Sequence, residues 1–443
     1  MDSGPASVLA SMEKAFLMGK FAVLMATAFV DMIGAVMILP LIPFYADTMG
    51  ASGFVIGVLI SAFSIAQLVS VPLWGRLSDR HGRRPVVVLG LAISSVSYIV
   101  FAFADSLWLL FLSRAVQGLG GGTVGVIQAY VADAHAPEER AKGLGWLSAA
   151  TSLGTIVGPA LGSVLAAIWG RSAPGLGAAM LCLLNLAFAW RFLPEARELR
   201  TSTDSHAVPV PAVKRSPWSV LGRPRDTAAR LIWTYAVAIG AFYGILAVLT
   251  MFLSRQFGVG EKTIGYFFMW FGAAGVIVRT TLVGPAARRL GEVRMARVGV
   301  VLLASGLTLF PFSKTYAVLL FSMTLIPLGT AFTFPAVTAL LSRVVPSRER
   351  GTYMGVQQTA GGMARVVFPW WDGWAFDHIG MAAPFVVCGA LTAGTLWLIQ
   401  GVKVPARRAR TGQSSGAVTP NTPGSPSVVS APTNKVASRR VSA

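Results

Sequence analysis

The amino-acid sequence predicts an all-α integral membrane protein in which twelve transmembrane helices form two pseudo-symmetric six-helix bundles. Three observations predict this fold: an apolar composition, twelve apolar runs of spanning length, and short patterns of the first half that recur in the second. Of the 443 residues, 54% are hydrophobic and 12% are charged. Because a soluble domain carries about 25% charged residues, this composition suits a bilayer and would expose large apolar patches in water.

Each predicted span has the length that a bilayer requires, which is about 20 mostly apolar residues. The spans are 20–45, 53–74, 85–104, 107–131, 144–168, 174–193, 230–253, 263–284, 296–313, 315–340, 353–375 and 382–402. The first run is longer than the apolar core of a signal peptide, and it contains Asp31. We therefore expect it to be retained as a helix.

The net charge of +19 does not indicate a nucleic-acid partner, because the basic residues do not gather in one domain. They recur in short polar breaks between the apolar runs. When the termini and the even-numbered breaks are placed on one side, that side holds 30 of the 37 Lys and Arg residues, and the other side holds four. Since cytoplasmic loops carry the excess of Lys and Arg, both termini are predicted to be cytoplasmic.

Polar stretches set the predicted domain boundaries. They are a cytoplasmic N-terminus (1–19), a first bundle (20–193), a cytoplasmic linker (194–229), a second bundle (230–402) and a disordered cytoplasmic tail (403–443) rich in Ser, Thr, Pro and Gly. Cys182 and Cys388 both fall in apolar runs, so neither a disulfide framework nor a metal site is expected.

The two halves share short patterns at a constant offset. Residues 75–82 (GRLSDRHG) follow the second span, and residues 284–291 (GPAARRLG) follow the eighth, 209 positions later. Pro159 in the fifth span matches Pro369 in the eleventh, at an offset of 210. Transporters built from such repeats hold their substrate between the halves, near the middle of the membrane.

Four motifs resemble the major facilitator superfamily. Residues 75–84 (GRLSDRHGRR) resemble its signature loop between the second and third helices. Residues 114–118 (RAVQG) resemble the fourth-helix motif of proton-coupled members, and residues 154–162 (GTIVGPALG) resemble the fifth-helix motif of antiporters. Residues 31–43 resemble the first helix of the drug:proton antiporters, which include tetracycline exporters and vesicular amine transporters. The resemblance covers about residues 20–402 and implies the major facilitator fold.

Asp31, Arg114 and Gln117 are the residues that the resemblance implies for proton coupling. A carboxylate in mid-membrane costs about 2.5–3.5 kcal/mol on insertion scales, so it is expected to have a function. Asp31 is expected to take up a proton, to bind the ammonium group of a cationic substrate, or to serve packing alone. Arg114 keeps its proton and acts by pairing with an acid, with Gln117 as its hydrogen-bonding neighbour; the alternative is an arginine that snorkels to the interface.

The signature loop is expected to act as a conformational latch. The resemblance implies that Asp79 caps a neighbouring helix and that basic residues pair with acids across the interface between halves, with Asp133 as a candidate member. The gating residues are Gly75, Asp79, Arg80, Gly82, Arg83, Arg84 and Asp133. Membrane topology alone would explain the arginines, but not Asp79 or the spacing of the glycines.

The fifth span carries small residues on one face. Gly154, Gly158 and Gly162 recur every four positions, which allows close helix contact, and Pro159 permits a bend. The resemblance implies a bend that prevents leak in exporters, whereas ordinary tight packing is the alternative.

Substrate contacts are nominated from polar and aromatic residues in spans that line the cavity in relatives. They are Gln128, Tyr243, Trp270, Phe334, Gln357 and Arg365. Such a wall suits amphipathic organic compounds. Arg365 is expected either to contact an anionic or chelating substrate or to tie helices together. The second signature copy has Arg288 and Glu292 where the first has Asp79 and Arg83, so coupling and latch chemistry are expected in the first half only.

The function that follows is proton-coupled export of small amphipathic compounds by alternating access, as in drug or tetracycline efflux. A sugar or organic-acid carrier and a transporter-like sensor are the alternatives. An enzyme is not expected, since the sequence shows neither a nucleophile–base set nor a phosphate-binding loop. The expected partners are a small-molecule substrate, protons and lipid, with the proton gradient in place of a cofactor. We expect a monomer in a cell membrane, inner or plasma.

Overall fold

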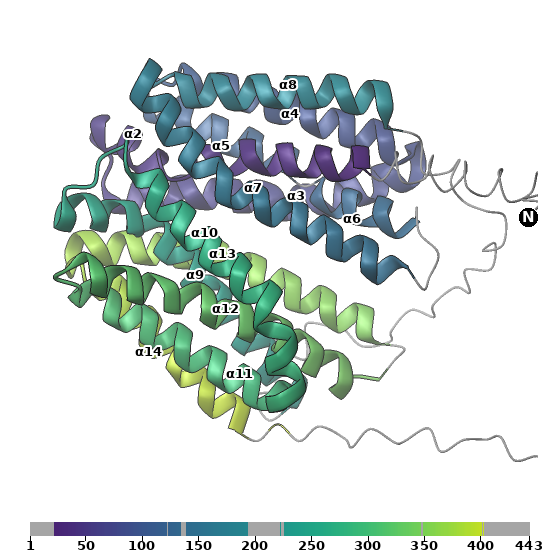
Figure 1. Ribbon diagram of the computed structural model, residues 1–443, viewed down its shortest axis with the longest axis vertical. Helices are drawn as coiled ribbons and strands as arrows, with labels where there is room; N and C mark the ends of the chain where they lie inside the picture. The colour runs from purple at the N-terminus through teal and green to yellow at the C-terminus, as the bar shows by residue number, and fades with distance from the viewer. Residues whose placement is uncertain are drawn as a thin grey trace, which may run out of the picture. The chain divides into compact units, whose positions relative to one another are not determined.

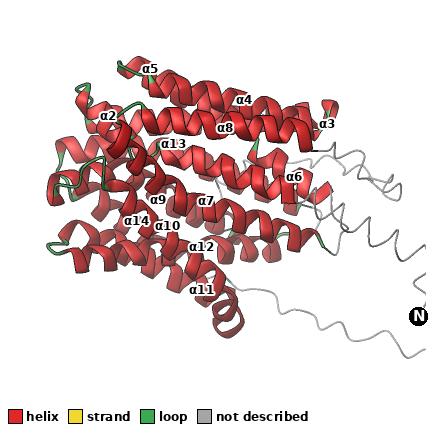
Figure 2. Ribbon diagram, turned by 45° about the horizontal axis from the view of Figure 1, so that its top comes forward, coloured by secondary structure: helices red, strands yellow, loops and turns green. Residues whose placement is uncertain are grey.

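The computed structural model describes residues 22–121, 123–133, 139–193, 222, 226–346, 349–400 and 402. Helices account for nearly all of these residues, and the described ranges contain no strand (Figure 2). The predicted N-terminus, most of the predicted linker and nearly all of the predicted tail lie outside the described residues.

The first half begins with a helix over residues 22–37, which we call the first helix. It continues with α2 (Ile42–Thr48), α3 (Gly53–His81), α4 (Arg83–Ala102), α5 (Leu107–Gly121), α6 (Val124–Asp133), α7 (Arg140–Trp169) and α8 (Ala173–Phe192). Pro40 and Pro43 interrupt the first predicted span between the first helix and α2. Proline lacks the N–H group that a continuous helix needs.

The second half contains α9 (Thr227–Phe257), α10 (Ile264–Thr281), α11 (Val283–Leu309), a 3-10 turn (Phe310–Phe312), α12 (Tyr316–Val344), α13 (Arg350–His378) and α14 (Ala383–Gln400). Asp226 caps α9, because its side chain accepts a hydrogen bond from the amide of Ala228. The second bundle therefore begins a few residues before the predicted position.

Eleven spans within the described residues are long and apolar enough to cross a membrane. The helix that misses this criterion is α13, which carries Arg365 and Asp372, yet it is 29 residues long and packs against α3 and α9. With α13, the helices match the twelve predicted spans in order, and the all-α membrane fold is confirmed.

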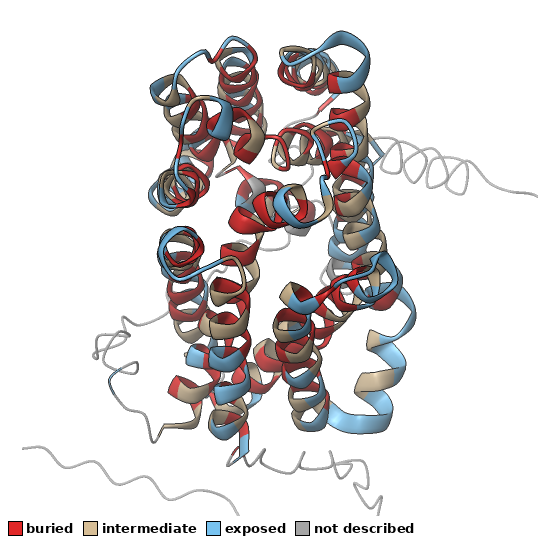
Figure 3. Cartoon of the chain, turned by 90° about the vertical axis from the view of Figure 1, so that its left-hand side faces the viewer, coloured by how far each residue is buried: buried red, intermediate tan, exposed pale blue. Residues whose placement is uncertain are grey.

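The outer surface of these helices is apolar. Large aliphatic side chains such as Val69, Leu73 and Leu184 are more than half exposed, which suits contact with lipid tails. The most exposed aromatic residues are tryptophans near helix ends: Trp108, Trp169, Trp190 and Trp397. Tryptophan concentrates at the membrane–water interface, so these positions mark the two borders of the bilayer. Figure 3 shows buried positions turned toward neighbouring helices and exposed positions turned outward.

One prediction about the signature motif was wrong. Residues 75–81 are not a loop, because α3 continues through them to His81 and only Gly82 separates α3 from α4. Span prediction measures apolar length, and α3 extends beyond its apolar part into polar residues. Asp79, in the last turn of α3, lies 2.7 Å from Arg83, the first residue of α4, so this ion pair joins the two helices across Gly82. Gly82 has φ 101°, a conformation that glycine adopts without strain.

Within each half, long helices pack side by side (Figure 1). In the first half α4 packs against α5 and α8, and in the second half α11 packs against α12 and α14. Two helix pairs make most of the contacts between the halves: α3 with α13, and α7 with α10. Smaller contacts join α9 to α2 and to α3. The two main pairs form what we call the seam.

The seam is tight because glycines let backbones touch. A Cβ atom built on Gly57 would lie 2.0 Å from the carbonyl oxygen of Pro369, and one built on Gly265 would lie 2.2 Å from that of Pro159. Asp377 accepts hydrogen bonds from the amides of Gly53 and Phe54, both at 3.0 Å. We call the helix ends near Arg83 the basic end; these contacts lie toward the opposite end.

Candidate functional site

Asp31 lies near the middle of the first helix and is half-buried. Its carboxyl group interacts electrostatically with Tyr98 of α4 and with Cys182 of α8. Gly34, one turn later, keeps the first helix close to this wall, because a Cβ atom there would lie 3.4 Å from the Tyr98 ring. Asp31 therefore stands beside a tyrosine and a thiol within its own bundle.

A chain of polar side chains connects Arg114 to Tyr98. The Arg114 guanidinium donates to Oε1 of Gln117, and Gln117 Nε2 lies 3.3 Å from the Tyr98 hydroxyl oxygen and 3.4 Å from the backbone oxygen of Ala35. All three side chains are buried, with Arg114 only 3% exposed. The structure thus brings the three predicted coupling residues together through Tyr98.

Arg114 is held by the protein interior and does not reach the membrane surface. Its guanidinium carbon lies 4.8 Å above the Phe63 ring centre, and its Nε has no hydrogen-bond partner. Within the described residues, no carboxylate lies within 4.0 Å of it. A fixed cation with a spare donor, near a carboxyl group that can hold or release a proton, can stabilise the charged form of that acid when the two approach.

The glycine face of α7 packs directly on the first helix. Cβ atoms built on Gly154, Gly158 and Gly162 would lie 2.8, 2.8 and 2.3 Å from backbone oxygens of the first helix. Pro159 contacts α10 across the seam. The predicted motif therefore positions the helix that carries Asp31 and contacts the other half.

Arg83 is the centre of a polar network at the basic end. Its side chain lies 2.7 Å from Asp79, 3.1 Å from Asp133 and 2.5 Å from the hydroxyl of Ser78. Arg84 donates to the backbone oxygen of Trp190. These partners all belong to the first half, so Arg83 joins α3, α4 and α6.

The second half holds a matching ion pair with its charges exchanged. Glu292, at the position of Arg83, lies 2.5 Å from Arg343, near the end of α12. The preceding Gly291 has φ 70°, like Gly82 before Arg83. The expectation that latch chemistry is confined to the first half was therefore incomplete, because comparing residues one at a time cannot reveal a pair in which both charges are reversed.

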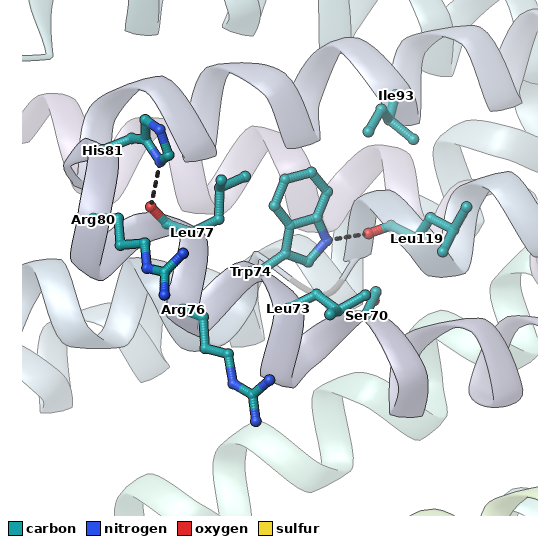
Figure 4. A pocket seen from close by; sticks show the side chains of 9 residues that line it. All are labelled: Ser70, Leu73, Trp74, Arg76, Leu77, Arg80, His81, Ile93 and Leu119. Carbon is teal, nitrogen blue, oxygen red and sulfur yellow. Dashed lines mark hydrogen bonds between the residues drawn. The ribbon is translucent and has the colours of Figure 1, made fainter.

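A small pocket lies beside the signature segment, between α3, α4 and α5 (Figure 4). Its walls are mainly apolar, and the indole N–H of Trp74 donates to the backbone oxygen of Leu119 at 2.6 Å. Arg76 and Arg80 extend from α3 at its margin (Figure 4). Arg80 is exposed. The backbone oxygen of Gly75 accepts a hydrogen bond at 2.9 Å from the Ser78 hydroxyl, so Gly75 connects to the Arg83 network through Ser78.

In the second half, aromatic rings from three helices gather around Phe242 of α9. Its ring centre lies 5.5 Å from that of Tyr243 in the same helix, 5.8 Å from that of Phe271 of α10 and 6.5 Å from that of Phe334 of α12. The Arg365 guanidinium carbon lies 5.5 Å from the centre of the Tyr243 ring, and its buried Nε has no partner. We call this group the aromatic cluster.

Three nominated substrate residues lie elsewhere. Gln128 of α6 is exposed, and Trp270 of α10 is 46% exposed and donates to the Thr324 hydroxyl at 3.1 Å. Gln357 is fully buried, and its Nε2 lies 3.3 Å from the Thr338 hydroxyl. Within the described chain, no group of three His, Cys, Asp or Glu side chains could hold a metal ion.

Sequence reasoning missed Tyr98, Phe242 and Phe271. Each lies in an apolar run, where an aromatic residue is indistinguishable from one that faces lipid. The one usable signal was Tyr98, whose hydroxyl needs a polar partner when buried.

The family profile of the Major Facilitator Superfamily matches residues 24–369 and, in a second match, 231–438. The chain belongs to this superfamily. Among superfamily members it is 30% identical over 351 residues to the class G tetracycline resistance protein of Vibrio anguillarum, covering 78% of this chain and 84% of the relative. It is 28% identical to multidrug resistance protein 2 of Bacillus subtilis (strain 168), covering 83% and 91% of the two chains.

Solved superfamily structures share the fold. The crystal structure of the human organic anion transporter MFSD10 (TETRAN) aligns with a TM-score of 0.63 and 25% identity, covering 87% of this chain and 99% of that chain. The nucleoside transporter NupG aligns with a TM-score of 0.70 but only 13% identity, covering 86% and 98%, so it supports the fold alone. The polar chain lies in the first half of the chain and the aromatic cluster lies in the second.

Proposed function

We propose that this protein is a proton-coupled antiporter that exports small amphipathic organic compounds by alternating access. The observation that carries the proposal is the polar chain Arg114–Gln117–Tyr98, which ends beside the mid-membrane acid Asp31. A carboxyl group in that position has the chemistry to exchange one proton per cycle. The similarity to tetracycline and multidrug resistance proteins supports export.

The aromatic cluster supports the substrate class. Its rings offer flat apolar surface, and Arg365 offers one cation with an unused donor. Ring-containing compounds that carry an anionic or strongly electron-rich group match both features. The similarity to an organic anion transporter agrees with such a preference.

Membrane orientation follows from charge. The basic end carries Arg76, Arg80, Arg83 and Arg84, so we place it in the cytoplasm. The seam contacts lie toward the opposite end, which suits the state whose cavity opens to the cytoplasm. The cycle then consists of rocking the two halves around the central site, with proton entry driving substrate exit. Both halves of the site lie in one chain, so we propose a monomer, residing in a cell membrane.

Flux measurements in proteoliposomes test the proposal. The purified chain is reconstituted, and uptake of a panel of anionic, cationic and neutral aromatic compounds is compared with and without a pH gradient. We expect gradient-driven accumulation for ring-containing compounds, and we expect Asp31→Asn to abolish it because the amide cannot carry a proton. Asp105→Asn, in an exposed loop, is the matched control. Accumulation that ignores the pH gradient, or that persists in Asp31→Asn, contradicts the proposal.

A further inference from the structure

A second carboxyl group is buried in the other half of the molecule. Asp372 of α13 is fully buried. The Cys388 thiol of α14 lies 3.3 Å from its Oδ1 and 3.5 Å from its Oδ2. Within the described residues, no Lys, Arg or His nitrogen lies within 4.0 Å of it. A thiol is a weak hydrogen-bond donor, so Cys388 alone does not provide the hydrogen bonding that an ionised Asp372 carboxylate requires.

The surrounding charged and titratable groups do not provide a cationic partner for Asp372. On α9, the Arg255 guanidinium lies over the Phe376 ring, and Tyr243 lies against Arg365. On α13 itself, Asp377 is engaged by the amides of α3, and His378 stacks on Trp374. Cys388 is the only titratable residue of α14. An unpaired buried charge costs several kcal/mol, so this environment favours the neutral acid.

The fold does not need an acid at this position. The match of Pro159 with Pro369 places Asp372 where α7 has Gly162. In the first half, Gly162 of α7 packs on the backbone of Met37, at the end of the first helix. In the second half, the glycine is on the partner helix: a Cβ atom on Gly244 of α9 would lie 1.9 Å from Asp372 Oδ2. In each half, one glycine is enough for the two helices to pack closely. The Asp372 carboxyl group is therefore not required for this helix contact.

The part of α13 that carries Asp372 also meets the first half, whereas the Asp372 side chain itself contacts α9 and α14. Pro369 and Gly373, on either side of it in α13, both touch the backbone of α3 across the seam. Gly244 belongs to α9, the helix that carries Phe242 and Tyr243 of the aromatic cluster. Rocking of the halves must move α13 relative to α3 at this level, and it alters the access of water to this part of α13.

We propose that Asp372 is a second proton-binding site, which takes up a proton from the outer side when the seam opens, holds it as the seam closes, and releases it toward the cytoplasm before the seam reopens. In the release step the O–H bond of the carboxylic acid breaks, the proton passes to water on the cytoplasmic side, and the carboxylate is left; in the loading step water on the outer side returns a proton to the carboxylate. This inference rests on the proposed function. Each half then carries one acid next to a cysteine: the half-buried Asp31 near Cys182, and the fully buried Asp372 against Cys388.

The stoichiometry of transport tests the proposal. With the membrane voltage clamped at zero, each proton exchanged multiplies the steady-state accumulation of substrate by ten per pH unit, because one unit is about 1.4 kcal/mol. We expect Asp372→Asn to lower the accumulation ratio at a gradient of one pH unit by about tenfold. Asp105→Asn again serves as the control.

The outcomes separate this inference from the proposed function. If the wild-type protein ignores the pH gradient, the proposed antiport fails. If the wild type responds and Asp372→Asn accumulates substrate to the same ratio, the antiport stands and the second site is overturned.

A measurement on the unmodified chain covers the case in which Asp372→Asn does not fold. Dicyclohexylcarbodiimide, an apolar reagent, modifies carboxyl groups that are protonated in apolar surroundings. We expect mass spectrometry to find the adduct on the peptide containing Asp372 at a pH that ionises surface carboxylates. We also expect the labelling to fall when transported substrate is cycling. A wild-type protein that is never labelled at Asp372 overturns the proposal.

Discussion

At the scale of single residues, Tyr98 connects groups that sequence motifs identified separately. Its hydroxyl oxygen lies 3.3 Å from Gln117 Nε2, and its ring lies against the first helix beside Asp31. Gln117 also contacts the first helix directly, at the backbone oxygen of Ala35, but the side chain between Gln117 and Asp31 is that of Tyr98. Predicting it required knowing which face of α4 meets the first helix, and an apolar run does not give that rotation.

We expect Tyr98→Phe to slow proton-driven export about fivefold, because one buried hydrogen bond is worth about 1 kcal/mol and a tenfold change in rate corresponds to about 1.4 kcal/mol. Pre-steady-state proton uptake, followed with a pH-sensitive dye in proteoliposomes, measures the effect. Tyr266→Phe, at an exposed position of α10, removes a hydroxyl without touching the chain and is the control. Equal rates in the two variants would remove Tyr98 from the coupling path.

At the scale of helices, the two halves use one design with different residues. Gly82 and Gly291 both adopt positive φ, and each precedes the charged partner in an ion pair. The first half pairs Arg83 with Asp133, and the second pairs Glu292 with Arg343. The sequence comparison led us to expect latch chemistry in the first half only, because it compared residue types position by position. An electrostatic attraction, however, is unchanged when both charges of a pair are reversed.

A charge-exchange experiment tests whether this second pair is functional. Glu292→Arg alone places two arginines together, and we expect lower thermal stability and slower transport. Adding Arg343→Glu restores opposite charges, and we expect most of both losses to be recovered. Arg343 is half exposed, so the coupling energy from a double-mutant cycle should be about 0.2–1 kcal/mol. Losses that simply add in the double variant would show that the two residues act independently.

At the scale of the whole molecule, glycine-lined contacts hold the halves together at one end. Gly53 and Gly373, and Gly57 and Pro369, bring α3 and α13 into backbone contact. Alternating access requires these contacts to separate once per cycle. A covalent link across the seam should therefore block the transport cycle.

A cross-link across the seam is expected to arrest transport. A Cβ atom on Gly53 would lie 2.7 Å from Asp377 Oδ1, which places Gly53→Cys and Asp377→Cys within reach of a disulfide. We expect oxidation to abolish substrate flux and reduction to restore it, in the double variant only. Each single variant under the same oxidant is the control, and full flux by the cross-linked protein would contradict the rocking motion proposed here.

The sequence by itself determined the membrane class, the order of the helices and the repeat of the halves, because apolar length and spacing are local properties of the chain. It also identified Asp31, Arg114 and Gln117 as polar groups in apolar surroundings. Only the tertiary structure decided that Tyr98 joins them, that Glu292 finds Arg343 and that Asp372 is buried against Gly244. Those pairings depend on how each helix is rotated about its axis, and in a helix with apolar residues on all sides that rotation is set by its neighbours.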